Sequence, residues 1–269
     1  MKLILSCLLT LMLFIQTSAQ TVDEILAKFE IASGGKEKLL AVTSIKMESV
    51  LKMNLMGQAL EINLNTVKEK DKLFRRDMSG IMGMGSSYIL ITDTAGYTFI
   101  PSMPSFGGQA GSSSMLNKMS AVELAGQQYE MDCAGPFGPL VNYAAKGYQA
   151  ELLGTDKVNK LECFKIKLTM KNNQQIQYLI SAKDYTVIQV NAVGEMAANL
   201  SGFASIMKMF GNDRKNMKTS ISYSNYNMTD GLLFPSKQVI SIGPIETVIE
   251  HVSLYINQPI DNMFYRNTK

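Results

Sequence analysis

Apolar and polar residues alternate at every second position along most of the chain. Between residues 45 and 65, Ile, Met and Leu at one phase are separated by Lys, Glu and Asn at the other. A strand with this pattern has one apolar and one polar face, which is typical of an antiparallel sheet covered on one side. The alternation predicts strands at 45–53, 60–65, 73–78, 87–91, 97–100, 148–154, 163–170, 175–180, 185–193, 219–228, 234–242 and 245–256.

Helical spacing replaces the alternation in a few segments. Thr21 with Glu24, and Ser120 with Glu123, have the spacing of a capping box, in which each side chain bonds a free backbone N–H of the other residue. Glycines end the predicted helices, and Pro139 suits a first helical turn. The predicted helical segments are 21–34, 36–41, 120–135 and 139–147. Residues 101–118, rich in Ser, Gly and Pro, predict a long loop.

These patterns predict one domain over residues 20–269, since no Pro/Gly-rich linker divides the chain. The expected fold class is mainly β, of the α+β kind: a single large curved antiparallel sheet with helices covering its concave face. The apolar phase of the strands should share that face. We expect an apolar ligand-binding cavity there, lined by Met47, Leu51, Met53, Leu60, Ile62, Leu64, Phe74, Met78, Ile166, Leu168 and Met170.

The strand pattern is suspended between residues 194 and 216. Large apolar residues recur there at spacings of three and four, which is a helical stripe. They are Met196, Leu200, Phe203, Met207 and Phe210. The stripe fits a helix packed on the sheet, and it also fits a lid over the cavity or a surface that meets a membrane or partner. Gly194 and Gly211 flank the segment and suit either hinges or ordinary helix ends.

The N-terminus has the features of a secretory signal peptide. Lys2 precedes an apolar stretch at 3–15, and the small residues at 17–19 predict cleavage after Ala19. The alternatives are a transmembrane anchor, for which the stretch is short, and a lipoprotein signal at Cys7, which precedes most of the apolar region. Export of residues 20–269 predicts a periplasmic location.

Composition narrows the possible chemistry. Lys and Arg number 26 against 23 acidic residues, a near balance that argues against a nucleic-acid partner. His251 is the one histidine, so a multi-histidine metal site is excluded, and we place it on the polar face of strand 245–256. Phosphate-loop, dinucleotide-binding, G-x-S-x-G and C-x-x-C motifs are absent. We therefore expect no enzyme activity, no metal ion and no cofactor.

Sulfur-containing residues leave several interpretations open. Cys133 and Cys163 would remain after cleavage, and an oxidising compartment permits a disulfide between them. The chain has 19 methionines, and this flexible residue suits both core filling and surfaces that accept apolar ligands of varying shape. A copper site is a competing idea, because Met82-x-Met84 and Met207-x-Met209 offer thioether ligands.

Several stretches, in order, resemble periplasmic outer-membrane lipoprotein-sorting carriers of the LolA/LolB-like family. They are DEILAKF (23–29) with Gly34-Gly35, PLVNY (139–143) with KGY (146–148), ELLG (151–154), CFKIKL (163–168), Tyr178 with Tyr185, DGLLFP (230–235) and NQPID (257–261). The resemblance spans nearly all of 20–269. It departs from the family where 71–75 lacks a proline, where Tyr97 replaces a common Trp, and where 194–216 resembles an insertion.

The resemblance implies a half-open antiparallel barrel with helices forming a lid over an apolar cavity. It further implies a periplasmic carrier that holds a lipoprotein acyl chain or another lipid-like ligand and contacts membranes at their periphery at most. Burial of acyl chains is worth about 0.8 kcal/mol per CH₂ group, so binding needs no chemical step. The alternative is a sensor or scaffold of the same fold that binds envelope proteins and shuttles nothing.

Overall fold

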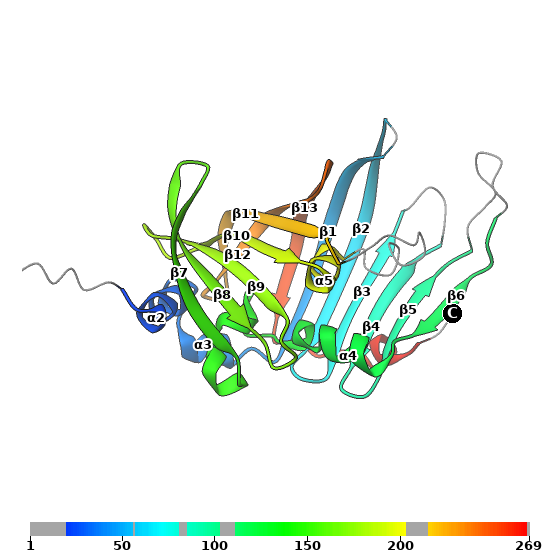
Figure 1. The fold of residues 1–269 in the computed structure, drawn as a ribbon. Helices are drawn as coiled ribbons and strands as arrows, with labels where there is room; N and C mark the ends of the chain where they lie inside the picture. The colour runs from blue at the N-terminus through cyan, green and yellow to red at the C-terminus, as the bar shows by residue number, and fades with distance from the viewer. Residues whose placement is uncertain (1–19, 56, 81–84, 103–110, 203–214, 268–269) are drawn as a thin grey trace, which may run out of the picture.

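One antiparallel sheet contains every strand that the computed structural model describes (Figure 1). The structure describes residues 20–55, 57–80, 85–102, 111–202 and 215–267, so the expected signal peptide at 1–19 lies outside the described residues. The sheet has 13 strands in the order β6-β5-β4-β3-β2-β1-β13-β12-β11-β10-β9-β8-β7. Because the edge strands β6 and β7 do not pair with each other, the sheet is not closed into a barrel, as predicted.

The strands follow one another as antiparallel neighbours along the chain. Those before the helical interlude are β1 Ser44–Leu55, β2 Gln58–Glu69, β3 Leu73–Ser79, β4 Ser87–Thr92, β5 Gly96–Ile100 and β6 Met115–Lys118. Those after it are β7 Gln149–Val158, β8 Leu161–Thr169, β9 Gln175–Ser181, β10 Val187–Val193, β11 Lys218–Thr229, β12 Leu232–Ile242 and β13 Ile245–Ile256. The last strand, β13, pairs with the first, β1, and so joins the two groups into one sheet.

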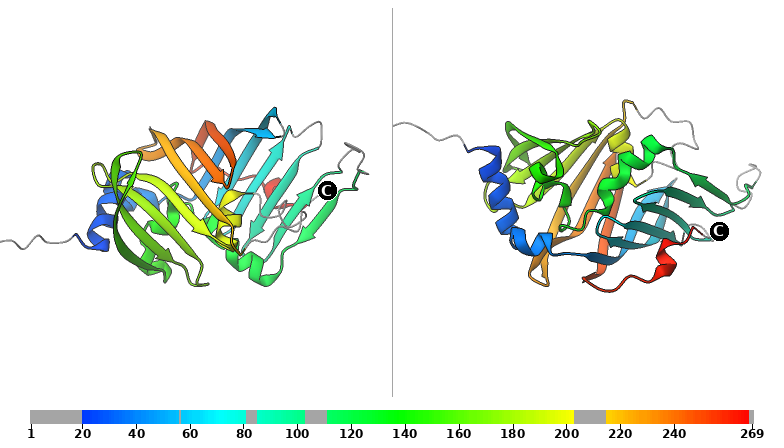
Figure 2. Two further views of the ribbon diagram at one scale, coloured as in Figure 1. Left: turned by 45° about the horizontal axis from the view of Figure 1, so that its top comes forward. Right: turned by 90° about the horizontal axis from the view of Figure 1, so that it is seen from below.

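Short helices accompany the sheet. They are α2 Val22–Ala32, α3 Lys36–Leu40, α4 Ala121–Gln127 and α5 Glu195–Ser201, with the 3₁₀ segments η1 Gln128–Met131, η2 Gly138–Leu140, η3 Tyr143–Lys146 and η4 Asn262–Tyr265. Viewed from below, α2, α3, η1 to η3 and α4 lie in front of the curved sheet, whereas η4 packs on its other face (Figure 2, right). Within the described ranges, no helix combines the length and the apolar character needed to cross a membrane.

Both predicted capping boxes are present and begin α2 and α4. The predicted helix at 120–135 is wrong in length, because α4 ends at Gln127 and continues only as the 3₁₀ segment η1. The predicted helix at 139–147 is likewise replaced by η2 and η3, with Gly147 in a left-handed conformation that stops η3. The predicted loop at 101–118 ends in β6, which pairs with β5.

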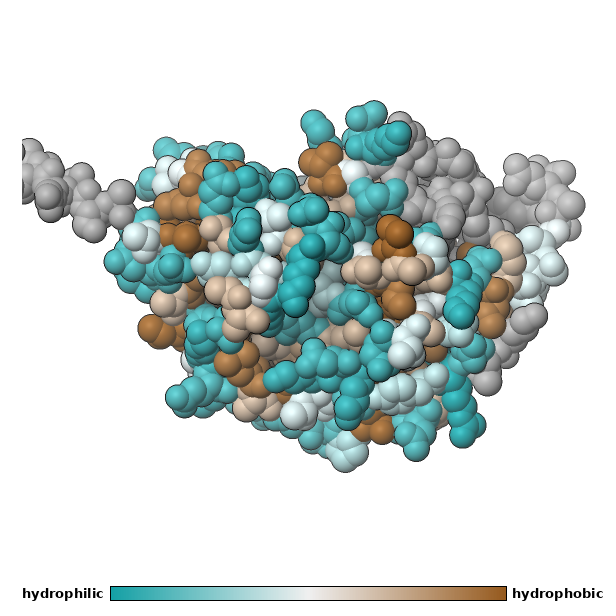
Figure 3. All heavy atoms as spheres, turned by 60° about the horizontal axis from the view of Figure 1, so that its bottom comes forward, coloured by the Kyte–Doolittle hydropathy of each residue, from teal (hydrophilic) through white to brown (hydrophobic). Residues whose placement is uncertain are grey.

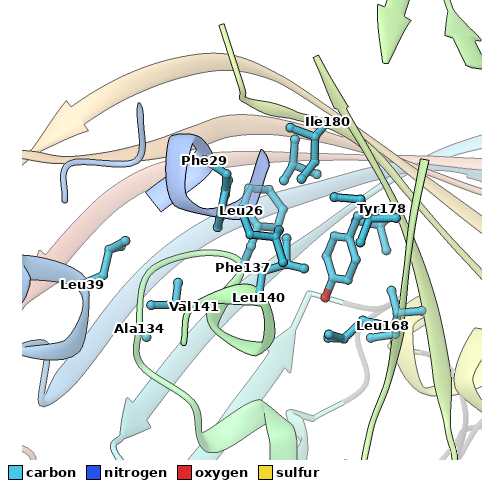
Figure 4. Close-up of a cluster of buried hydrophobic side chains, with 14 of the residues drawn as sticks. Leu26, Phe29, Leu39, Ala134, Phe137, Leu140, Val141, Leu168, Tyr178 and Ile180 are labelled. Atoms are coloured by element: carbon cyan, nitrogen blue, oxygen red, sulfur yellow. The ribbon is translucent and has the colours of Figure 1, made fainter. Parts of the chain in front are cut away.

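The main core lies where α2 and residues 133–141 pack on the strands β8 to β12. Fully or almost fully buried side chains from both layers meet there (Figure 4): Leu26, Phe29, Leu39, Ala134, Phe137, Leu140, Val141, Leu168, Tyr178 and Ile180. Phe137 is central, with its ring edge-on to Phe29 at 6.3 Å and to Tyr223 at 4.9 Å between centroids. This half of the concave face is therefore filled by the protein's own side chains.

Candidate functional site

A cavity of about 170 Å³ lies on the concave face, beside the main core. Its floor comes from strands of both groups, and its cover comes from residues 129–139 and from the end of α5. Phe137 belongs to the main core and also lines the cavity, so its ring stands at the boundary between the filled and the hollow parts of the face.

The floor of the cavity is apolar. Its side chains belong to one cluster at the middle of the sheet: Leu51, Leu64, Met78, Ile221, Ile240 and Ile249. The cross-strand register explains why they meet, because Leu64 pairs with Met78 and Ile221 pairs with Ile240. Residues that pair directly across neighbouring strands have their side chains on the same face of the sheet.

Arg76 places a positive charge beside this apolar floor. It follows Phe74 and precedes Met78 in the inward phase of β3, and it pairs across the sheet with Thr66 of β2. Its Nε donates a hydrogen bond to Thr66 Oγ1 at 3.2 Å, and its guanidinium carbon lies 5.2 Å from the centroid of the Phe74 ring. Arg76 and Thr66 both line the cavity.

The other charges at the cavity wall are paired. Lys68 Nζ lies 3.4 Å from Glu130 Oε2, and both side chains are largely buried. Asp132 of the cover pairs with Lys146 of η3, and Lys146 Nζ also donates to the carbonyl oxygen of Gly138 at 2.6 Å. Within each of these two pairs, the positive and the negative charge neutralise each other.

His251 lies inside the cavity, so its predicted position on the polar face is wrong. The register between β1 and β13 jumps from Glu48–Ser253 to Ser49–His251, which leaves Val252 as an extra residue in β13. Such a bulge reverses the in–out phase of the strand that carries it. The bulge therefore turns His251 inward and leaves Val252 on the outer face, 68% exposed.

The imidazole of His251 is held in its neutral form. Its Nδ1 lies 2.7 Å from Ser49 Oγ, and Gln238 Nε2 donates to its Nε2 at 2.9 Å. Burial lowers the pKa of His251 to about 4, and the nearby Arg76 charge acts in the same direction. A ring with so low a pKa is a weak base, and an amide rather than a carboxylate orients it. The Ser49–His251 contact therefore does not favour hydrolytic chemistry.

Three tyrosines, Tyr129, Tyr178 and Tyr223, complete the lining. Burial raises the pKa of each well above its usual value. The Arg76 charge opposes this for Tyr129 and Tyr223, so the guanidinium acts on both rings as it does on His251. Among the described residues, the buried hydroxyl of Tyr129 has no hydrogen-bond partner.

The predicted cavity residues divide into three groups in the structure. Met47, Leu51, Leu64 and Met78 line the cavity. Met53, Leu60 and Ile62 continue the same face toward the β1–β2 turn, since Leu51 pairs with Ile62 and Met53 with Leu60. Ile166, Leu168 and Met170 are buried in the main core, and Phe74 packs against Ile91 and Met131. For these last four residues, protein side chains occupy the place that we expected a ligand to take.

The predicted lid is only partly described. Met196 and Leu200 lie on α5, whereas Phe203, Met207 and Phe210 lie outside the described residues. α5 ends at Ser201, where Gly202 adopts a left-handed conformation. Met196 is buried in the main core, and Leu200 lines the cavity. This described part is a packed element of the fold.

The predicted disulfide is wrong, because both cysteines are free. Cys133 is buried in the main core on the concave side. Cys163 is adjacent to Phe164 on β8 and belongs to the opposite phase, where it packs with Val158 and Leu179 in a separate cluster. The sheet therefore lies between the two thiols.

The described residues do not bring three His, Cys, Asp or Glu side chains together as a metal site. The proposed copper ligands Met82, Met84, Met207 and Met209 lie outside the described residues.

Arg76 and the lining tyrosines were missed as site residues. The alternation contained a signal for Arg76, because Phe74, Arg76 and Met78 share one phase and a charged residue interrupts two apolar ones. Tyr178 was noted for the family resemblance and not for its inward position. No signal of this kind existed for Gln238, whose position depends on pairing with Ile249 across the sheet.

Comparison with known proteins bears on the fold. No family model and no curated protein matches the sequence. Among solved structures, a LolA superfamily protein from Nitrosomonas europaea is similar, with a TM-score of 0.57 and 12% identity over 93% of this chain and 99% of that chain. An outer membrane lipoprotein-sorting protein domain from Vibrio parahaemolyticus gives a TM-score of 0.44 and 11% identity over 90% of this chain and 94% of that chain. The similarity to the Nitrosomonas europaea protein shows that this chain shares the fold of that LolA superfamily protein.

Proposed function

We propose that this chain is a periplasmic binding or carrier protein that holds the apolar chain of a lipid-like ligand in its cavity. The ligand class includes lipoprotein acyl chains, as the family resemblance implies. The observation that supports the proposal is the division of the concave face. One half is packed with the protein's own side chains, while the other leaves a cavity whose floor is Leu, Ile and Met. Burial of a hydrocarbon chain against this apolar floor is favourable.

The outer surface shows less sign of a binding site than the cavity does. On the face seen in Figure 3, apolar residues occur singly and in small separate groups among hydrophilic ones. Scattered apolar residues are normal on a protein surface, whereas a partner-binding site is marked by a contiguous patch. This supports a ligand held inside the fold over the alternative of a scaffold that binds a protein partner through this face.

Extraction and mass spectrometry of the natively purified, exported protein test the proposal. We expect a lipid-like molecule to co-purify with the wild-type chain. Leu51→Phe should reduce its amount several-fold, because a larger side chain fills the cavity floor. Val252→Phe is the matched control, since it adds a ring to the outer face and should leave the amount unchanged. A wild-type protein that carries no apolar molecule and binds no fluorescent fatty-acid analogue would favour the scaffold instead.

A further inference from the structure

Arg76 is the charge in the cavity that the fold does not balance. The Lys68–Glu130 and Lys146–Asp132 pairs are complete. In the part of the chain that the structure describes, no carboxylate lies within ion-pair distance of Arg76, and the hydroxyl of Thr66 is the polar group that its side chain bonds. A partly desolvated cation is costly unless an anion accompanies it.

The guanidinium is oriented for a ligand. Thr66 occupies the Nε–H, which leaves the terminal nitrogens of the planar fork without a described protein acceptor. Gly202 stands beside them: a Cβ added there would lie 3.3 Å from Nη1, so its missing side chain keeps space at the guanidinium. The fork of an arginine matches the two oxygens of a carboxylate or phosphate.

A second polar group lies in the cavity wall. The Tyr129 hydroxyl is buried at the cavity wall and has no hydrogen-bond partner among the described residues. A buried donor without an acceptor costs free energy, which an oxygen of a ligand would recover. The neighbouring His251 is neutral and already bonded to Ser49 and Gln238, so it adds no competing charge.

We propose that the cavity takes a single-chain anionic amphiphile, whose carboxylate or phosphate head pairs with the guanidinium of Arg76 while its hydrocarbon chain lies on Leu51, Leu64 and Ile249. This rests on the proposed function and adds the chemical class of the ligand. Arg76 is then the residue that selects an acidic head group over a neutral one.

The test compares three probes with the same chain: dodecanoate, dodecyl phosphate and dodecanol, each below its micelle concentration. Exported protein is freed of bound lipid on a hydrophobic resin and titrated by competition with a fluorescent fatty-acid analogue. We expect the wild type to bind at least one anionic probe about tenfold more tightly than dodecanol, as a charge-assisted hydrogen-bonded pair provides. Whichever anion binds more tightly identifies the head group.

Substitutions of Arg76 test whether the preference for anionic probes depends on this residue. Arg76→Met should lower the affinity for the anions to that for dodecanol and leave dodecanol binding within about threefold. Arg76→Lys keeps the charge but loses the fork, so it should retain part of the preference, and it serves if Arg76→Met does not fold in a thermal melt. Lys46→Met is the matched control, because it removes a positive charge from the outward phase of β1.

The outcomes separate the two proposals. Equal wild-type affinities for the three probes, or a preference that survives in Arg76→Met, would overturn the assignment of Arg76 while the carrier proposal stands. Binding of none of the probes to the wild type would overturn both.

Discussion

The imidazole of His251 is buried between a hydroxyl and an amide in the cavity, and its environment disfavours protonation. The folded-state pKa is about 4, whereas an exposed histidine titrates near 6.5. Between these two values the unfolded chain binds a proton that the folded chain does not. Protonation of His251 therefore favours unfolding, and its contribution to stability is lost as the pH falls from about 6.5 toward 4.

We predict a pH-dependent stability that depends on this residue. Lowering the pH from 7 to 4 should cost up to about 3 kcal/mol through His251 alone, from the difference between its two pKa values. His251→Gln keeps a polar side chain without this titration. Urea unfolding of both proteins at several pH values measures the effect. Parallel pH profiles for the wild type and His251→Gln would contradict it.

The two cysteines should be free and unreactive in the folded protein. Burial raises the pKa of the Cys133 thiol to about 12 and also raises that of Cys163. Because the thiolate is the reactive form, both should react slowly with a disulfide reagent at pH 8. Without reductant, denaturation should release two thiols from residues 20–269, and each Cys→Ala variant should release one. Absence of thiols in the denatured, unreduced protein would restore the disulfide.

At the scale of elements, the same inward phase of the sheet has two environments. Leu168 of β8 is fully buried beneath the main core, whereas Leu64 of β2 borders the cavity. Deleting a packed side chain costs more than deleting one that already faces a void, because the lost contacts are more numerous.

We predict that Leu168→Ala lowers the free energy of unfolding by about 3–5 kcal/mol and Leu64→Ala by about 2 kcal/mol or less. Urea unfolding in the absence of ligand measures both. Leu64→Ala should also weaken the binding of the fluorescent fatty-acid analogue, and Leu168→Ala should leave it unchanged if the protein stays folded. A larger loss of stability in Leu64→Ala would mean that no cavity borders β2.

Local patterns predicted the elements that depend on local chemistry. Alternation located the strands, and the Thr21 and Ser120 capping boxes located the starts of α2 and α4. The errors about the cavity arose where the position of a residue depends on distant pairing. The extra residue Val252 in β13 is defined only by its alignment with β1, and that alignment turned His251 inward. The division of the apolar face into packed and hollow parts likewise depends on where residues 133–141 fold back onto the sheet.

At the scale of the whole molecule, the cavity follows from one long, curved sheet whose short helices do not fill its whole concave face. Helix α2 and residues 133–141 fill the concave face over β8 to β12. η1 and the end of α5 cover the remaining part of the concave face but leave a cavity beneath them. A cavity remains because one half of the concave face is filled and the other half is only covered. The charge of Arg76 gives that cavity a polar end.

The resemblance read from the sequence and the similarity of structure agree on the fold. The short motifs lie in family order along the chain, and the Nitrosomonas europaea protein covers 93% of the chain at only 12% identity. Such a fold can be kept while every lining residue changes, so the ligand must be argued from the cavity itself.

The methionines allow the central claim, that an apolar chain binds in this cavity, to be measured directly. Met47 and Met78 line it, while Met115 and Met228 are exposed elsewhere on the molecule. The measurement is a titration of ¹³C-methyl-methionine-labelled protein, freed of lipid, with dodecanoate and observed by NMR. We predict saturable shifts of the Met47 and Met78 methyl signals, assigned by Met→Leu variants, with Met115 and Met228 unmoved. Unchanged Met47 and Met78 signals at saturating dodecanoate would contradict the claim.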